Sequence, residues 1–200
     1  MEFLDYFPTS ILKEDLDISN DTLSSYIDHI KTNEKLLDVN GGFKITENQK
    51  LLAHSIFRSI KKNILDLAKT YLDNLEHLYQ DLQISSSWGF IHPPGGTPSP
   101  HSHPNSYISG CLYFTDGVPI KFFNPLFKQW SFIPQKSQEN QSFRSLDEFP
   151  IYPTPGKLIL FPSFLYHTID PNTTDKDRIS IAFNIIPKGE FGPVSSKIYL

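Results

Sequence analysis

The chain changes character near residue 84, and this change constrains its fold more than any other feature. Beyond it, short runs rich in aromatic and β-branched residues are separated by Pro and Gly, as is typical of strands. These runs are residues 84–91, 107–114, 119–123, 157–161 and 178–186. No helical pattern alternates with them, which disfavours an α/β fold. We therefore predict a mainly β structure of the jelly-roll or barrel kind.

The part before residue 84 has the apolar spacing of helices. Residues 1–15 are expected to be extended, and residues 20–38 to form a helix that stops before Asn40-Gly41-Gly42. A second helix is predicted over residues 47–82, begun by the capping box Thr46-Glu-Asn-Gln49. Its apolar face is expected to pack on the sheet face that carries Ile179, Ile181 and Phe183. The helix residues on this face are Leu52, Ile56, Ile60, Ile64, Leu75 and Leu78.

The chain has 200 residues, enough for one domain with a substantial core. We expect a single domain, 1–200, in which residues 1–84 give helical support and residues 85–200 form the jelly-roll core. Residues 124–155 are polar and predict a long excursion that could act as a lid. With the 93–100 loop, this excursion is expected to shape the substrate pocket.

Composition excludes several classes of partner. The net charge of −4 disfavours nucleic acid, which normally needs a basic face. No run approaches the roughly 18 apolar residues of a membrane span, and the first residues lack a secretory pattern. The single cysteine, Cys111, fits a reducing compartment. We expect a cytoplasmic protein that acts on a small molecule or a peptide; the sequence indicates no oligomeric state.

Three histidines have the placement of metal ligands. His101 and His103 lie between Pro100 and Pro104, which stiffen the turn, and in extended chain residues i and i+2 share a face. His167 follows the strand-like run 157–161. Imidazole suits iron, zinc, copper or nickel. The alternatives are two surface histidines in a loop and one structural histidine.

Arg178 opens a run in which polar and apolar residues alternate. Arg178, Ser180, Ala182 and Asn184 share one face, so the polar face would line a cavity inside the sheet. A guanidinium there needs a carboxylate, which it can meet with two parallel hydrogen bonds. The alternative is a salt bridge to Asp175 or Asp177.

Taken together, the histidines and the arginine predict an iron site with an acidic co-substrate. Six-coordinate iron held by three protein ligands keeps three positions open. A 2-oxo acid would fill two of them and O2 the last. The far carboxylate of 2-oxoglutarate would then meet Arg178 and Ser180. The predicted cofactors are therefore Fe(II), 2-oxoglutarate and O2.

Several segments resemble the 2-oxoglutarate/Fe(II)-dependent oxygenases related to prolyl hydroxylases. They are Leu4–Ser10, Trp88–Ile91, His101–Phe114, Gly156–Ser163, His167 and Arg178–Asn184. The resemblance implies a double-stranded β-helix with iron at one mouth and helices on the major sheet. It also implies catalytic roles for His101, His103, His167 and Arg178.

One position departs from the wider superfamily. The usual first motif is His-x-Asp or His-x-Glu, whereas here the third position is His103, a form that the related group also shows. This favours a three-histidine site. It leaves open a carboxylate ligand such as Asp116 or Asp170, a site that uses only one of the paired histidines, and His92 as a weaker candidate.

Three further residues are expected to support the co-substrate. Tyr113 could donate to its carboxylate, although a packed aromatic side chain is an equal alternative. Asn105 and Asn184 are expected to orient ligands or co-substrate. Trp88 is expected to be a core residue.

The leading function is an oxygenase that decarboxylates 2-oxoglutarate to succinate and hydroxylates a C–H bond. The alternatives are a cupin-like three-histidine dioxygenase or isomerase that does not use 2-oxoglutarate, and a non-catalytic jelly-roll binding protein. Arg178 and Ser180 favour the first of the three.

Overall fold

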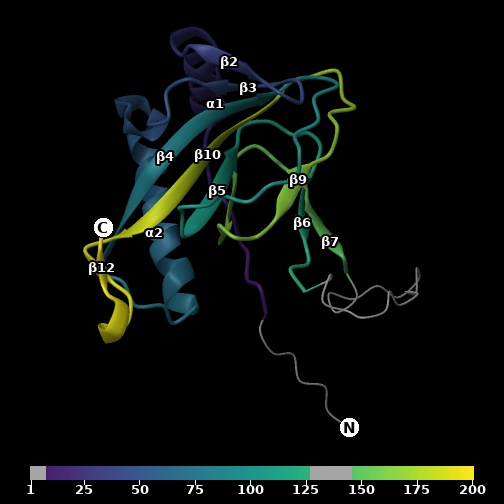
Figure 1. Ribbon diagram of the computed structural model, residues 1–200. Helices are drawn as coiled ribbons and strands as arrows, with labels where there is room; N and C mark the ends of the chain where they lie inside the picture. The colour runs from purple at the N-terminus through teal and green to yellow at the C-terminus, as the bar shows by residue number, and fades with distance from the viewer. Residues whose placement is uncertain (1–7, 127–145) are drawn as a thin grey trace.

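A seven-stranded antiparallel sheet forms the body of the protein. The structure, a computed structural model, describes residues 8–126 and 146–200. The long strands run diagonally in Figure 1. The strand order is β1 (Leu12–Asp15), β8 (Lys157–Pro162), β5 (Ile108–Tyr113), β10 (Arg178–Lys188), β4 (Asp81–His92), β3 (Phe43–Thr46) and β2 (Leu36–Val39).

A smaller sheet lies beside the first. It consists of β7 (Glu148–Ile151), β6 (Ile120–Phe123) and β9 (His167–Ile169). A short pair, β11 (Glu190–Phe191) and β12 (Ile198–Tyr199), flanks the turn η5 (Val194–Ser196) near the C-terminus. The prediction of a mainly β fold is confirmed, and each of the strand-like runs past residue 84 is a strand.

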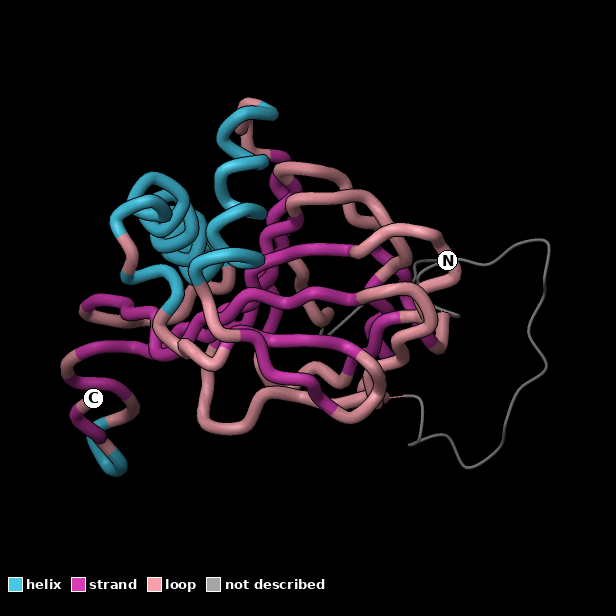
Figure 2. The backbone as a smooth tube through the Cα atoms, turned by 90° about the horizontal axis from the view of Figure 1, so that it is seen from above, coloured by secondary structure: helices cyan, strands magenta, loops and turns pink. Residues whose placement is uncertain are grey.

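The helical segments before residue 75 gather on one side of the main sheet, as Figure 2 shows. They are α1 (Asn20–Asp28), the π-helical turn η1 (His29–Asn33), the 3₁₀ turns η2 (Leu51–Ala53) and η3 (Ser55–Phe57), and α2 (Arg58–Asn74). Among the described residues, no helix is both long and apolar enough to cross a membrane.

The first predicted helix was too long. Helical structure ends at Asn33, and Leu36–Val39 pairs with Phe43–Thr46 as a hairpin. Gly41 and Gly42 make the turn with φ of 102° and 74°, values that favour glycine. The alternating runs on both sides of this turn carried the hairpin signal.

The predicted capping box is wrong. Thr46 ends β3, where its hydroxyl donates to the Asn48 carbonyl at 2.9 Å and accepts the Gly89 N–H at 3.1 Å. The Gln49 amide donates to the Thr46 carbonyl instead of capping a helix. The two 3₁₀ turns η2 and η3 follow, and regular helix begins only at Arg58.

The predicted packing of this helix on the sheet is largely confirmed. Leu52, Ile60 and Ile64 share one core cluster with Ile179, Ile181 and Phe183, and Leu75 packs against it. Two positions were assigned wrongly: Ile56 is 37% exposed and Leu78 is 91% exposed. Ile56 belongs to η3, and Leu78 lies past the end of α2, so neither follows the α2 periodicity.

The 124–155 segment is not a simple excursion. Its last part holds β7, which pairs with β6. Residues 127–145, which make up most of the predicted lid, lie outside the described residues.

Candidate metal and co-substrate site

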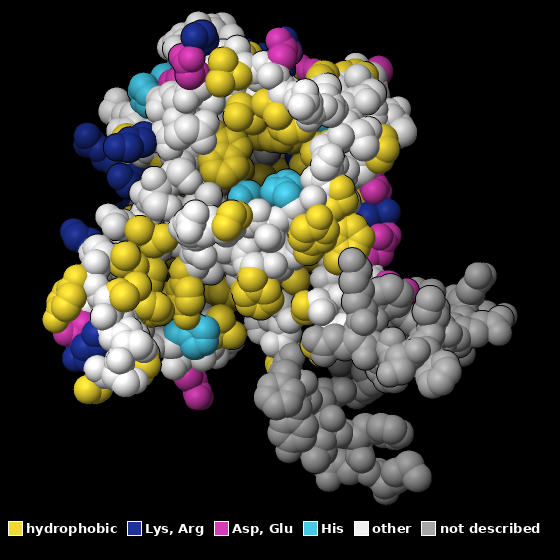
Figure 3. Space-filling model, in the orientation of Figure 1, with side chains coloured by type: hydrophobic (Ala, Val, Ile, Leu, Met, Phe, Trp, Pro, Cys, Tyr) yellow, Lys and Arg dark blue, Asp and Glu magenta, His cyan; other side chains and the backbone are white. Residues whose placement is uncertain are grey.

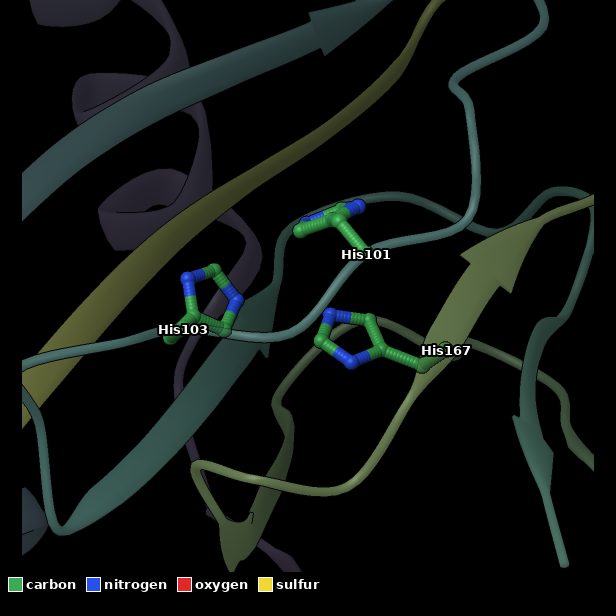
Figure 4. A group of neighbouring side chains, drawn as sticks. All are labelled: His101, His103 and His167. Atoms are coloured by element: carbon green, nitrogen blue, oxygen red, sulfur yellow. The ribbon is translucent and has the colours of Figure 1, made fainter. Parts of the chain in front are cut away.

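His101, His103 and His167 converge on one point, as the sequence predicted. One nitrogen from each ring lies within 4.8 Å of the other two. The ring centroids are 4.5 Å apart for His101–His167 and 5.1 Å for the two pairs that include His103. Figure 4 shows the three rings facing a common space. Nitrogens bound to one metal at about 2.1 Å and at right angles lie about 3 Å apart, so small side-chain movements would suffice.

Backbone hydrogen bonds hold these histidines in place. The His101 N–H donates to the His167 carbonyl, and the His167 N–H donates to the His101 carbonyl, both at 2.9 Å. The His103 N–H donates to the Ser163 carbonyl, also at 2.9 Å. His167 does not simply end a strand, as the sequence suggested, because it opens β9 of the smaller sheet.

The protonation of the rings suits metal binding. His101 Nδ1 lies 3.0 Å from the Ser99 carbonyl, and His167 Nδ1 lies 2.8 Å from the Leu165 carbonyl. A carbonyl only accepts, so both Nδ1 atoms carry the proton and both Nε2 atoms are free to ligate. Burial, and then the neighbouring His101, lower the pKa of His103 to about 4. Burial is also the main reason that the pKa of His167 falls to about 3.

The other candidate ligands lie outside this cluster. Among the described residues, no carboxylate joins the three histidines. Asp170 pairs with Lys121 at 3.0 Å, and Asp116 is exposed. His92 is fully buried, and its Nε2 contacts the Gly96 carbonyl at 2.7 Å. It faces Arg178 across β4 and β10.

Arg178 is a buried cation with no anion beside it among the described residues. Its side chain is 1% exposed, and within the described part of the chain none of its three nitrogens has a hydrogen-bond partner. The alternative salt bridge to Asp177 is wrong, since Asp177 binds Lys31 at 2.8 Å. Asp175 lies exposed and makes no ion pair with Arg178. An uncompensated buried charge costs several kcal/mol, so a guanidinium without a partner among the described residues favours an anionic ligand.

Two hydroxyl groups beside Arg178 also lack partners. Ser180 faces Tyr113 across β10 and β5, and both hydroxyl oxygens are buried without a hydrogen bond among the described residues. Burial raises the pKa of Tyr113 well above its ordinary value, so its phenol stays protonated and can donate. The structure therefore brings Arg178, Ser180 and Tyr113 together, as predicted, and each of them has hydrogen-bond donors without a partner among the described residues.

The same face of β10 links this group to the histidines. Ala182 faces Trp88 across β4, and the Trp88 ring lies 6.0 Å from that of His103. Ala182 lies four positions along the strand from Arg178, a distance of about 13 Å. The histidines thus lie over the middle of β10 and the cation at its start. Trp88, expected to be core, is only half-buried here.

The two asparagines differ. Asn184 accepts from Ser109 Oγ at 2.8 Å and donates to Ser86 Oγ at 3.0 Å. Ser109 in turn contacts Ser163 Oγ at 2.8 Å, and the Ser163 carbonyl holds the backbone of His103. Asn105 is exposed in a turn with φ of 62° and makes no side-chain hydrogen bond to the described residues.

Sequence reasoning missed the three serines of this network, Ser86, Ser109 and Ser163, and the aromatic surroundings of the histidines. Ser109 shares strand parity with Tyr113, which was the available signal. The Phe161 ring lies 4.9 Å from the His167 ring, and the Phe122 ring lies 5.7 Å from it. Figure 3 shows histidine side chains beside a hollow bordered by hydrophobic groups.

Residues 86–184 match the family model described as "Putative 2OG-Fe(II) oxygenase". This segment contains the histidine triad, Arg178 and Ser180. No curated protein sequence matches the chain significantly.

Solved structures share the fold. HygX from Streptomyces hygroscopicus, with nickel and 2-oxoglutarate bound, is 14% identical over 90% of this chain and 83% of its own, with a TM-score of 0.64. The α-ketoglutarate-dependent epimerase SnoN from nogalamycin biosynthesis is 12% identical over 92% and 82%, with a TM-score of 0.67. A Pseudomonas putida prolyl-4-hydroxylase is 15% identical over 90% and 94%, with a TM-score of 0.60.

These similarities confirm the predicted jelly roll with helices on its major sheet. Through residues 86–184, just under half of its length, this chain is similar to the 2OG-Fe(II) oxygenase family, whose members use Fe(II), 2-oxoglutarate and O2.

Proposed function

We propose that the protein is an Fe(II)- and 2-oxoglutarate-dependent dioxygenase that hydroxylates a C–H bond and releases succinate and CO2. Residues 1–200 would form one oxygenase domain. The substrate would be a small molecule or a peptide. HygX has been solved with hygromycin B bound, and a prolyl-4-hydroxylase shares the fold, which makes both substrate classes reasonable.

The observation that carries the proposal is the buried Arg178, whose guanidinium has no hydrogen-bond partner in residues 8–126 and 146–200. A protein that did not bind an anion here would hold a desolvated guanidinium at a cost of several kcal/mol. A dicarboxylate offers one carboxylate for this cation and leaves the other end for a metal. This argues against a three-histidine enzyme that does not use 2-oxoglutarate, and against a non-catalytic jelly roll.

Each residue has a separate role in the proposal. His101, His103 and His167 would hold Fe(II) through neutral imidazoles, and Fe(II) supplies the activation of O2 that is coupled to decarboxylation of the 2-oxo acid. Arg178 would form parallel hydrogen bonds to the far carboxylate, with Ser180 and Tyr113 donating to the same group. Asn184 would fix the Ser163 segment that holds His103.

The half-buried sheet surface between Arg178 and the histidines suits the carbon chain of 2-oxoglutarate. Cys111 and Ala182 face each other across β5 and β10, and both are small. Their size leaves room above the sheet between Arg178 and the histidines. Trp88 and the aromatic rings near His167 would exclude water from the reacting groups.

A titration of 2-oxoglutarate into the anaerobic Fe(II) protein tests this function. The proposal requires a weak visible charge-transfer band, since it arises only when the 2-oxo acid chelates the metal. Succinate should then form when O2 is admitted. Arg178→Lys keeps the charge but loses the two-pronged geometry, so it should weaken 2-oxoglutarate binding by more than about tenfold. A wild-type protein that binds Fe(II) but gives no band would refute the proposal.

A further inference from the structure

A second group of ligating side chains lies in the helical layer. His29 begins η1, Glu34 follows this turn, and His54 lies between η2 and η3. One ligand atom from each lies within 4.8 Å of the others. We propose that His29, Glu34 and His54 form a second site for a divalent transition metal, Zn²⁺ in the first place. The iron-site proposal plays no part in this inference.

Local structure brings the three residues together. A π-helical turn has more residues per turn than an α-helix, and π-turns inside helices are often found at functional sites. Here the turn His29–Asn33 places His29 and Glu34 on the same side of the chain. The break between the two 3₁₀ turns directs His54 to the same carboxylate, and the two imidazole rings lie 5.0 Å apart, edge to face.

The distances agree better with a metal than with ion pairs. Glu34 Oε1 lies 3.3 Å from His29 Nε2 and 3.2 Å from His54 Nε2. A charge-assisted hydrogen bond between such groups is normally about 2.7–2.9 Å long. Ligands held tetrahedrally at about 2.0–2.1 Å from Zn²⁺ lie about 3.3–3.4 Å from one another. The Glu34 side chain is only 7% exposed, so its charge needs a counter-ion.

The contacts of His29 show which of its nitrogens faces the carboxylate. Thr32 Oγ1 donates to the Asp28 carbonyl at 2.6 Å and lies 2.8 Å from the Asn33 amide oxygen. The Asn33 NH2 group is therefore turned toward His29 Nδ1, 3.4 Å away, and can donate to it. The proton of His29 then lies on Nε2, between this nitrogen and the Glu34 carboxylate, where a metal ion would replace it.

His54 presents an acceptor to the same carboxylate. The Asn48 amide oxygen accepts the Lys50 N–H at 2.9 Å, which fixes the orientation of the amide. Asn48 Nδ2 therefore donates to His54 Nε2 at 2.9 Å, and this nitrogen carries no proton although it lies 3.2 Å from Glu34 Oε1. A metal ion bound here would displace Asn48 from the single lone pair of Nε2 and would remove the repulsion between this nitrogen and the carboxylate. Two imidazoles and one carboxylate, with water in the fourth position, are a ligand set that zinc takes.

The experiment uses Co²⁺, which reports coordination geometry by its visible spectrum, and Zn²⁺ as a competitor. The full chain would carry His101→Ala and His167→Ala, so that the histidine triad no longer competes for metal. We expect this protein to bind one Co²⁺ with the strong absorption of a tetrahedral site, and Zn²⁺ to displace it. Glu34→Gln, added to the same background, should weaken Co²⁺ binding by more than roughly tenfold. Glu47→Gln is the matched control, because Glu47 is an exposed carboxylate that pairs with Lys35.

A second measurement protects the test against a background that does not fold. In wild-type protein loaded anaerobically with Fe(II) and 2-oxoglutarate, one further Zn²⁺ should bind and raise the Tm, and neither effect should occur in Glu34→Gln. The inference fails if the cluster takes only a proton, so that no second metal binds. It also fails if Glu34→Gln and Glu47→Gln bind Co²⁺ equally well.

Discussion

The guanidinium carbon of Arg178 lies 4.8 Å from the centre of the Tyr113 ring, and neither side chain has a hydrogen-bond partner among the described residues. The aromatic face partly compensates the buried charge, by an amount of about 2 kcal/mol when desolvated. It leaves the N–H groups of Arg178 and the hydroxyl of Tyr113 free. The pair is therefore stable enough to fold yet keeps its donors for an anionic ligand.

Replacing Arg178 should raise the stability of the ligand-free protein while it weakens the binding of 2-oxoglutarate. Arg178→Met removes the uncompensated charge, so the ligand-free protein should gain at least about 1 kcal/mol in its free energy of unfolding. The same change should abolish the stabilisation that 2-oxoglutarate gives the wild type. Urea unfolding with and without 2-oxoglutarate measures both effects. If Arg178→Met lowers the stability of the ligand-free protein, a partner that balances the charge must exist within the fold.

The third histidine is expected to replace the usual carboxylate ligand. His103→Asp supplies an anionic oxygen at the same position and should retain iron, whereas His103→Ala should lose most of it. Iron content and succinate production in chloride-free buffer check this, since a halide can fill an open coordination position. An alanine variant that binds iron and turns over like the wild type would place the third ligand elsewhere.

The two asparagines provide a matched pair of variants. Asn184→Ala breaks the contacts with Ser86 and Ser109 behind the His103 segment, so iron affinity should fall by about 10–100-fold. Asn105→Ala should leave it unchanged, because that side chain makes no hydrogen bond to the described residues. Competition with a chelator measures both affinities. Equal effects in the two variants would contradict this role for Asn184.

The packing of α2 predicts a large contrast between two isoleucines. Ile60 is 2% exposed, so Ile60→Asp buries a lone carboxylate and should cost more than about 3 kcal/mol or prevent folding. Ile56 is 37% exposed, and Ile56→Asp should cost less than about 1 kcal/mol. Thermal unfolding followed by circular dichroism compares them. A wild-type Tm for Ile60→Asp would mean that this helix face is open to solvent.

The histidine triad should make the metal-free protein sensitive to acid. In the folded state the pKa values of His103 and His167 are lowered to about 4 and about 3. Below pH about 6.5 the unfolded chain therefore binds protons that the folded chain refuses, and the free energy of unfolding falls as the pH drops toward 4. Urea unfolding in chelator between pH 7.5 and 4.5 tests this. His103→Asn combined with His167→Asn should flatten the dependence, and an equally steep loss in that variant would assign it to other groups.

Patterns confined to a few residues were enough for the fold class and much of the site. Alternation from Arg178 to Asn184 predicted which side chains face inward, because successive residues of a strand point to opposite faces whatever their partners are. The spacing of His101 and His103 predicted that both rings would meet, and their convergence with His167 is confirmed. The apolar period around Ile60 and Ile64 identified a helix that covers the sheet.

Only the tertiary structure decided which partner each group takes, because partners come from distant segments that local propensity does not specify. Thr46 has the residues of a helix cap around it, yet its hydroxyl bonds to β4 because the β3–β4 pairing brings Gly89 within reach. Arg178 could have paired with Asp177 beside it, but the Asp177 carboxylate instead pairs with Lys31, 146 residues away in the sequence. The sequence determined that a buried arginine would need an anion; the fold decided that the protein itself does not provide one among its described residues.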